Sequence, residues 1–144
     1  MRILIGGDHA GHDLKQHLVE HLRSAGHEVV DHGTHGPDSV DYPDYARAVA
    51  QGVAADPGTL GVVVCGSGNG VNITANKQHG IRSALAWMPE IAALARQHNN
   101  ANVLALPARF ISKTVAVACL EAFLSASFEG GRHQARVDKI EAGC

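Results

Sequence analysis

The 144-residue sequence predicts an α/β fold, namely a single-domain, doubly wound, Rossmann-like sheet of five parallel strands with helices on both faces. Two observations carry this prediction. Short apolar runs alternate with helical patterns along the whole chain, and glycine clusters end the first and third of these runs. Strands that are covered on both faces read as nearly continuous apolar runs. No repeat or linker divides the chain, so we expect one domain over residues 1–144.

The first half of the chain is predicted to hold three strands and two helices. Leu14, Leu18 and Leu22 recur at helical spacing, and Gly26 is a natural stop after them. The third strand is rich in β-branched residues and is the clearest of the set. In order, the predicted elements are strand 2–6, helix 14–25, strand 28–31, loop 32–44, helix 45–55 and strand 60–65.

The second half continues the alternation with shorter strands. Pro89 sits at the favoured first turn of a helix, and Gly130 and Gly131 form a hinge before the last helix. In order, the predicted elements are helix 72–78, strand 82–87, helix 89–98, strand 103–106, helix 111–125 and helix 132–141.

Composition limits the classes of partner. The net charge of −2 gives no reason to expect nucleic acid or an anionic membrane surface, and no apolar run approaches the roughly 20 residues needed to span a bilayer. The N-terminus lacks the apolar core of a signal peptide. Cys65, Cys119 and Cys144 are an odd, widely spaced set, which fits a reducing compartment. We therefore expect a cytoplasmic protein without nucleic-acid or membrane partners.

The loop after the third strand, Gly66-Ser67-Gly68-Asn69-Gly70, is the first candidate site. Ligands of open parallel sheets bind at the carboxyl ends of the strands, and this loop lies there, before a helix. Its backbone N–H groups and the helix dipole favour a negative charge. The glycine spacing fits neither a dinucleotide fingerprint nor a P-loop. An ordinary tight turn is the competing interpretation.

Cys65 precedes this loop at the last position of the strand. A helix N-terminus stabilises a thiolate, although a lone cysteine in a strand is usually inert. A nucleophile would need a neighbouring base. A general base needs only a proton to abstract and a nearby group that stabilises the developing oxyanion. The glycine loop supplies that group.

Several further polar residues are candidates for binding a phosphorylated ligand. Asp8 and His9 follow the first strand, and Arg109 follows the fifth. Arg132 and Arg136 lie one helical turn apart, a spacing that suits a phosphate, but a solvated basic face is the alternative. If the last helix contributes to a site, it must dock, and a partner subunit is a plausible surface. No histidine pair has convincing metal-ligand spacing, so we expect no metal.

With these residues assembled, the chain resembles the ribose-5-phosphate isomerase B / galactose-6-phosphate isomerase family over essentially its whole length. The matching motifs are Gly7-Asp8-His9-Ala10-Gly11, Asp41-Tyr42-Pro43, Cys65–Gly70, Ala75-Asn76-Lys77, Gly80-Ile81-Arg82, Gln97-His98-Asn99 and Glu129–Gln134 with Arg136. The resemblance implies interconversion of D-ribose 5-phosphate and D-ribulose 5-phosphate through a cis-enediolate, in the non-oxidative pentose phosphate pathway, without metal or organic cofactor.

The resemblance also implies roles for individual residues. Cys65 would be the base, His98 would assist opening of the furanose ring, and Ser67 would assist proton transfer between the oxygens. The backbone of Gly66–Gly70, with Gly68 and Asn69 between, would stabilise the enediolate. The substrate and phosphate contacts would come from Asp8, Tyr42 and Asn99 for the sugar, and from His9, Arg109, Arg132 and Arg136 for the phosphate.

Two further family features bear on the chain. Some members lack the cysteine and use a glutamate just past the glycine loop, where this sequence has Val71, so the resemblance assigns the base to Cys65. Members are homodimers or homotetramers whose sites are shared between subunits.

The alternatives to ribose 5-phosphate isomerisation are allose 6-phosphate or galactose 6-phosphate as substrate, a non-catalytic phosphate- or nucleotide-binding module and, with less support, a hydrolase with a cysteine nucleophile.

Overall fold

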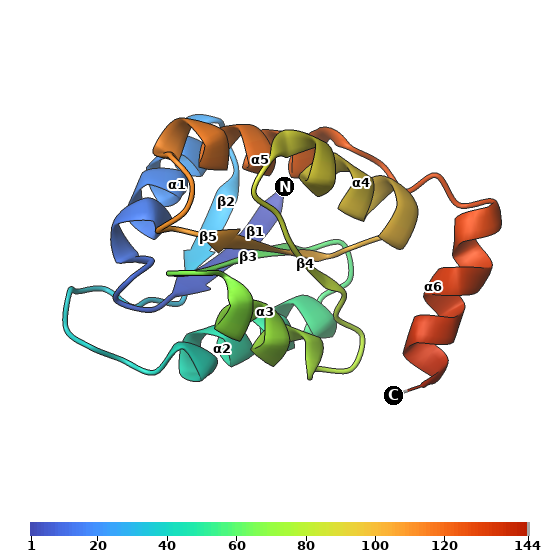
Figure 1. Ribbon diagram of the computed structural model, residues 1–144, viewed down its shortest axis with the longest axis horizontal. Helices are drawn as coiled ribbons and strands as arrows, with labels where there is room; N and C mark the ends of the chain where they lie inside the picture. Colours follow the sequence, from blue (N-terminus) through green and yellow to red (C-terminus); the bar gives the residue numbers. More distant parts are fainter. Residues whose placement is uncertain (144) are drawn as a thin grey trace.

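The computed structural model describes residues 1–143, so Cys144 lies outside the described residues. Strands and helices alternate as expected up to the fifth strand, and two helices follow it (Figure 1). In chain order the elements are β1 (Arg2–Gly7), α1 (His12–Ser24), β2 (Glu28–Asp31), α2 (Tyr42–Ala55), β3 (Leu60–Cys65), α3 (Asn69–Asn76), β4 (Ser83–Leu85), α4 (Pro89–Asn99), β5 (Val103–Pro107), α5 (Lys113–Ser125) and α6 (Arg132–Ala142).

All strand pairs are parallel, and the order in the sheet is β2-β1-β3-β5-β4. This confirms the predicted doubly wound fold. The chain leaves β1 toward one edge to form β2 and then crosses back to place β3 on the other side of β1. The register pairs Gly7 with Val64 and Cys65 with Pro107, so the loops after β1, β3 and β5 meet where the carboxyl ends of these strands lie side by side. Open sheets bind ligands at such a switch point.

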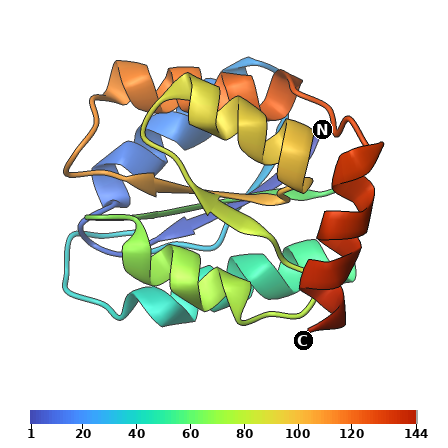
Figure 2. The same ribbon diagram turned by 45° about the vertical axis from the view of Figure 1, so that its right-hand side comes forward.

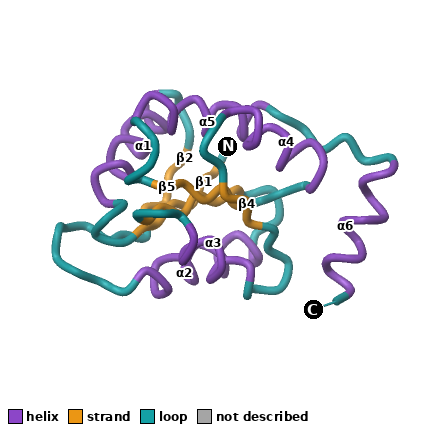
Figure 3. The backbone as a smooth tube through the Cα atoms, viewed as in Figure 1, coloured by secondary structure: helices purple, strands orange, loops and turns teal. Residues whose placement is uncertain are grey.

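Helices cover both faces of the sheet and enclose two apolar cores. Helices α1, α4 and α5 lie on one face, and α2 and α3 lie on the other (Figures 1 and 3). Side chains alternate along β3, because successive residues of a strand point to opposite faces. Val62 and Val64 join the core under α1, α4 and α5, whereas Val63 and Cys65 join the core under α2 and α3. The side chain of Cys65 is therefore on the α2–α3 side.

Helix α6 stands at the edge of these layers. It contacts α4 and extends past the sheet toward the layer of α2 and α3 (Figure 2). His133 and Val137 form its buried side, and Glu141 pairs with Arg82 at its far end. The proposed docking of this helix on a partner subunit stays a prediction.

Some element boundaries differ from those predicted. Helix α2 begins at Tyr42 rather than Tyr45, because Pro43 fits the first helical turn, where its missing N–H is not needed. Helix α3 begins at Asn69, three residues before the predicted start, directly after the left-handed Gly68. Helix α5 begins later, at Lys113, since the Ser112 hydroxyl accepts a hydrogen bond from the Val115 N–H at 3.1 Å. Within residues 1–143, no helix has the length and apolar character needed to cross a membrane.

Candidate active site

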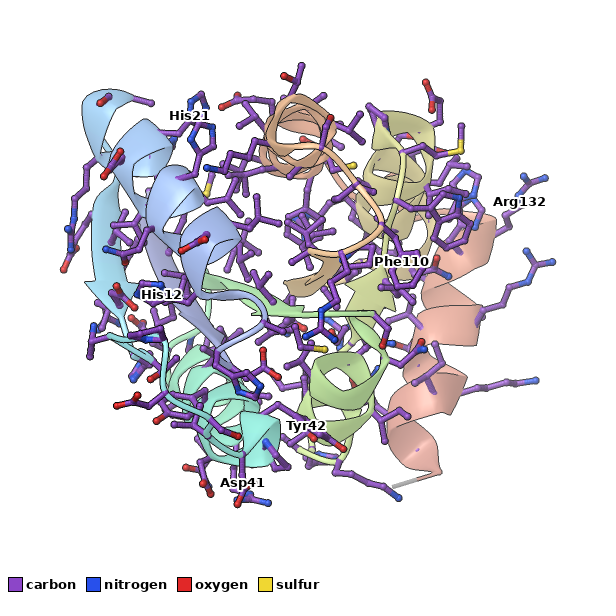
Figure 4. The ribbon with its side chains drawn as sticks, turned by 60° about the vertical axis from the view of Figure 1, so that its left-hand side comes forward. His12, His21, Asp41, Tyr42, Phe110 and Arg132 are labelled. Atoms are coloured by element: carbon purple, nitrogen blue, oxygen red, sulfur yellow. The ribbon has the colours of Figure 1, made fainter. Side chains whose placement is uncertain are left out.

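A cavity of about 440 Å³ opens at the edge where β1, β3 and β5 end. Figure 4 shows Tyr42 at the start of α2 and Phe110 on the loop after β5. The lining residues are Asp8, His9, Ala10, Tyr42, Cys65, Gly66, Ser67, Gly70, Arg109 and Phe110. All except Ala10 and Phe110 were predicted from the sequence as site residues. Phe110 is 76% exposed, and nothing in its sequence context distinguishes it from an ordinary loop residue.

Cys65 places a thiol in the wall of this cavity. It is the last residue of β3 and is 5% exposed. Its backbone carbonyl accepts a hydrogen bond from the Ala108 N–H at 2.9 Å, which ties the loop after β5 to the end of β3. Val71, the alternative position for a base, is fully buried in the same core and carries no ionisable group. Cys65 is thus the sulfur that a ligand in this cavity meets.

The glycine loop joins the thiol to the N-terminus of α3. Gly68 has a left-handed backbone (φ 76°), which turns the chain from the strand into the helix. The Asn69 N–H donates to the Ser67 hydroxyl at 3.3 Å, and both side chains are exposed. The first turn of a helix has N–H groups without intrahelical partners, and they favour an anion. The loop can therefore receive negative charge that develops beside Cys65.

Tyr42 packs directly against this loop. A Cβ placed on Gly70 would lie 2.4 Å from Cε1 of the Tyr42 ring, a separation that no side chain tolerates. Glycine is therefore required for the ring to approach the start of α3. The phenol of Tyr42 is partly exposed and borders the cavity, where it can contact a sugar hydroxyl.

Asp8 and His9 occupy the turn after β1. Asp8 is 7% exposed, and its Oδ1 accepts a hydrogen bond from the Gly11 N–H at 3.0 Å. Gly7 and Gly11 close this turn on β3, since a Cβ on either would lie 2.5 or 2.6 Å from the Val64 carbonyl oxygen. The Asp8 carboxylate is thus fixed beside the end of β3.

The tautomer of His9 follows from its partner. The Val40 N–H, on the loop between β2 and α2, donates to Nδ1 of His9 at 3.2 Å. Nδ1 is therefore an acceptor, and a neutral His9 carries its proton on Nε2. This arrangement leaves an N–H donor for an anionic ligand.

Arg109 brings a cation next to the glycine loop. Its backbone N–H donates to the Gly66 carbonyl at 2.9 Å. Its Nη1 atom would lie 3.1 Å from a Cβ on Gly66, so the guanidinium rests on the backbone of this glycine. Arg109 and His9 together make this cavity suitable for a phosphorylated ligand.

Of the predicted site residues, Gly68 and Asn69 lie on the glycine loop beside the cavity, whereas four others lie away from it, namely His98, Asn99, Arg132 and Arg136. Helix α4 runs back from the carboxyl edge, so His98 and Asn99, at its end, are close to the start of β5 (Figure 1). Asn99 borders a different cavity, of about 340 Å³, beside α6 and β4. Arg132 and Arg136 are exposed on α6, and Arg132 points away from the body of the molecule in Figure 4. The predicted site residues therefore do not all meet at one site within a single chain.

His98 belongs to a cluster that the sequence analysis missed. Its ring stacks on that of His133, with centroids 4.2 Å apart and an interplanar angle of 13°. Glu129 Oε1 lies 3.7 Å from Nε2 of His98 and 3.8 Å from Nε2 of His133. Burial, followed by the neighbouring His98 and Arg132, lowers the pKa of His133. No signal in the sequence indicates this cluster, because the position of α6 creates it.

These three residues are also the group of possible metal ligands within residues 1–143. A metal ion binds an imidazole nitrogen in the plane of the ring. Because the rings of His98 and His133 are nearly parallel and stacked, their in-plane lone pairs do not converge on one point. The geometry therefore favours a stacked pair of imidazoles over a shared metal ion.

Comparisons with known proteins agree on one family. The sequence model of the Ribose/Galactose Isomerase family matches residues 3–140. Ribose-5-phosphate isomerase B of Mycobacterium tuberculosis (strain CDC 1551 / Oshkosh) is 46% identical over 140 residues, covering 96% of this chain and 86% of that protein. The protein of the same name from Escherichia coli K12 is 45% identical over 141 residues, covering 98% and 95% of the two chains.

Solved structures give the same result. The ribose 5-phosphate isomerase of Thermotoga maritima superposes with a TM-score of 0.96 at 46% identity, covering 98% of this chain and 97% of that chain. Ribose-5-phosphate isomerase B of Mycoplasma genitalium, solved with bound ribulose-5-phosphate, superposes with a TM-score of 0.96 at 45% identity, covering 99% and 95%. The chain therefore belongs to the ribose/galactose isomerase family.

Proposed function

We propose that this protein interconverts D-ribose 5-phosphate and D-ribulose 5-phosphate through a cis-enediolate, with Cys65 as the base. The observation that carries the proposal is the thiol of Cys65 in the wall of a 440 Å³ cavity, between the glycine loop and the cation of Arg109. The Mycoplasma genitalium relative with bound ribulose-5-phosphate supports this choice of substrate.

The proton transfers follow from the placement of the thiol and the loop. The Cys65 thiolate removes the proton from C2 of the open-chain aldose, and negative charge develops on the oxygen at C1. Backbone N–H groups of Gly66–Gly70 stabilise that charge, and losing one such donor typically costs about 3–4 kcal/mol of barrier. Ser67 assists proton transfer from the C2 oxygen to the C1 oxygen. The Cys65 thiol then returns its proton to C1, which yields the ketose without a metal or organic cofactor.

The remaining residues open the ring and hold the phosphate. His98 donates a proton to the ring oxygen of the furanose, the bond between C1 and that oxygen breaks, and the anomeric hydroxyl releases its proton to solvent, which gives the open-chain aldehyde. Asp8, Tyr42 and Asn99 contact the sugar hydroxyls. The phosphate binds the Nε2–H of His9 and the guanidinium groups of Arg109, Arg132 and Arg136. Because the phosphate is remote from C1 and C2, its binding energy orients the reacting carbons.

We propose that the complete site contains residues of two subunits. Cys65 and the end of α4 lie at opposite ends of the strands in one chain, so a single site needs His98, Asn99, Arg132 and Arg136 from a partner in a homodimer or homotetramer. Mixing the inactive variants Cys65→Ala and Arg132→Ala should restore activity, because each mixed dimer then has one intact site. About a quarter of wild-type activity is expected after random exchange of the subunits of a symmetric dimer. No recovery would refute the shared site.

Two measurements test the reaction itself. Solvent deuterium should enter the product at C1 or C2 during turnover of ribose 5-phosphate, and complete absence of label would contradict the enediolate. Comparing kcat/KM for ribose 5-phosphate, allose 6-phosphate and galactose 6-phosphate tests the substrate, and a clear preference for a hexose phosphate would replace the pentose. If none of the three is isomerised, a non-catalytic phosphate-binding module becomes the better interpretation.

A further inference from the structure

His133 is a buried ionisable residue that the proposed reaction does not use. Among residues 1–143 it is the only buried histidine, although Arg132 and Arg136 on the same helix are exposed. Its ring lies parallel to the ring of His98 at 4.2 Å between centroids. A buried imidazole at this position therefore has one principal neighbour among the predicted catalytic residues.

The backbone around the cluster fixes this contact. The Glu129 N–H donates to the Gln97 carbonyl at 3.0 Å, which joins the segment before α6 to the end of α4. The His133 N–H donates to the Gly130 carbonyl at 3.0 Å, which sets the first turn of α6. Both bonds act on or beside the stacked residues, so the main chain holds His98 and His133 next to each other.

We propose that His133 is a positioning residue for His98, holding its imidazole by ring stacking in the orientation that opens the furanose ring. This inference rests on the proposed function, in which His98 acts on the cyclic sugar. His98 is 37% exposed in its side chain, whereas His133 is 9% exposed. One face of the His98 ring is covered by His133, and the exposed remainder is available to a substrate.

Stacking restricts the rotation of the His98 ring about its side-chain bonds. Proton transfer to a ring oxygen requires a nitrogen within hydrogen-bond reach and in line, so a freely rotating imidazole spends less time in a productive orientation. The charged groups around the stack are Glu129, Arg132 and Arg136, together with His98 itself. Glu129 Oε1 faces both Nε2 atoms, and its charge raises the pKa of His133, while Arg132 and Arg136 lower it.

The test separates ring opening from proton transfer at carbon. Ribose 5-phosphate is compared with its 4-deoxy analogue, which lacks the hydroxyl that closes the furanose ring and so needs no ring opening. His133→Ala removes the stacked ring, and His133→Phe keeps an aromatic face without the ring nitrogens. His21→Ala is the matched control, because His21 pairs with Glu121 at 2.6 Å on helices α1 and α5, away from His98.

His133→Ala should lower kcat on ribose 5-phosphate by roughly tenfold or more, with KM little changed, and should leave turnover of the 4-deoxy analogue as in wild type. His133→Phe should restore turnover of ribose 5-phosphate, and His21→Ala should match wild type on both substrates. Equal losses on both substrates, full activity of His133→Ala, or failure of His133→Phe to rescue would each overturn the inference.

A second measurement does not depend on the stability of the alanine variant. In wild type and His133→Phe, the ring protons of His98 should show the upfield NMR shift that a stacked aromatic ring causes. Absence of this shift in wild type would also overturn the inference. If wild type itself fails to isomerise ribose 5-phosphate, the proposed function fails with the inference. If wild type is active and only the His133 results differ from expectation, the inference alone fails.

Discussion

The cavity beside Cys65 and the cluster of His98, Glu129 and His133 are built in different ways. The cavity collects loops that follow adjacent parallel strands, so the order of the sheet brings its residues together. The cluster depends on where α6 lies after the last strand, and on the bond between Glu129 and Gln97 that joins α6 to α4. The order of the strands brings the residues of the cavity together, whereas the docking of one helix, α6, brings the residues of the cluster together.

This difference indicates a division of labour within the proposed reaction. The cavity holds Cys65, the proposed base, and the loop whose backbone N–H groups are the proposed donors for the chemistry at C1 and C2. The cluster holds His98, the proposed proton donor to the ring oxygen, with the ring of His133 stacked on it. Substitutions in the two regions should therefore impair different steps of the reaction.

The largest expected effect comes from Cys65→Ala. Loss of the base should lower kcat by about 10³-fold or more on both ribose 5-phosphate and its 4-deoxy analogue, since both need proton abstraction. Ribulose 5-phosphate should still bind, as calorimetry would measure. His98→Ala is the comparison and should affect only the cyclic substrate. Full activity of Cys65→Ala would remove this thiol as the base.

Stability provides a second contrast between the regions. Beside the end of β1, where Gly33 bonds to Gly7, the fully buried ammonium of Lys15 pairs with Asp31 at 2.8 Å, and Asp31 also accepts the Gly33 N–H at 2.9 Å. Lys15→Met should lower the free energy of unfolding by about 3–5 kcal/mol, because it leaves a buried carboxylate without its partner. In the cluster, Glu129 is 53% exposed, so Glu129→Gln should change stability by less than about 1 kcal/mol.

Chemical denaturation of the two variants measures this contrast. The double variant Lys15→Met/Asp31→Leu is the control, since removing both charges should recover much of the loss. If Lys15→Met and Glu129→Gln cost the same, the buried pair does not anchor the side of the sheet that carries the cavity.

A smaller effect is expected where the glycine loop approaches Tyr42. Gly70→Ala forces its new methyl group against the Tyr42 ring and should cost about 1–3 kcal/mol of stability together with a loss in kcat. Gly36→Ala is the matched control, because a Cβ there meets nothing within 4 Å. Thermal unfolding and steady-state kinetics measure both variants. Equal behaviour of the two would contradict the close packing of Tyr42 on this loop.

The smallest expected effect is a dependence of stability on pH. Burial alone would raise the pKa of Asp31, but the hydrogen bond and charge of Lys15, with the Gly33 N–H, outweigh it and lower the pKa below 3.8. A carboxyl whose pKa is lower in the folded state stabilises the protein above its ordinary pKa. This contribution should vanish as the pH falls from 3.8 through the lower folded value. The free energy of unfolding of Asp31→Asn should not show this loss at acidic pH. If its dependence on pH were the same as in wild type, Asp31 would not be the source of the loss.

The sequence predicted the region that is built from local connections. Cys65 ends one strong strand and the glycine loop follows it. Parallel strands bring Asp8 and Arg109 to the same end of the sheet, so both placements were derivable. The contact of Tyr42 with Gly70 was not, because it depends on α2 starting at Tyr42 rather than at Tyr45. Resemblance supplied Tyr42 and the role of His98.

The histidine stack could not be read from the sequence in the same way. His98 and His133 are far apart along the chain, and no periodicity or motif specifies where α6 docks. The same holds for Arg132 and Arg136, which share a spacing that suits phosphate but lie away from the cavity in one chain. Spacing identifies a helix face, whereas its neighbours depend on packing between distant segments.

The turn around Asp8 couples two sequence positions in evolution. Gly7 and Gly11 both approach one atom, the Val64 carbonyl oxygen, so a side chain at either position pushes the same atom aside. The costs of the two replacements are then not additive, because the first already displaces what the second would meet. Once one of these glycines has been replaced, replacing the other costs less stability, so it is less strongly retained. We therefore expect descendants of this turn to retain both glycines or to abandon both.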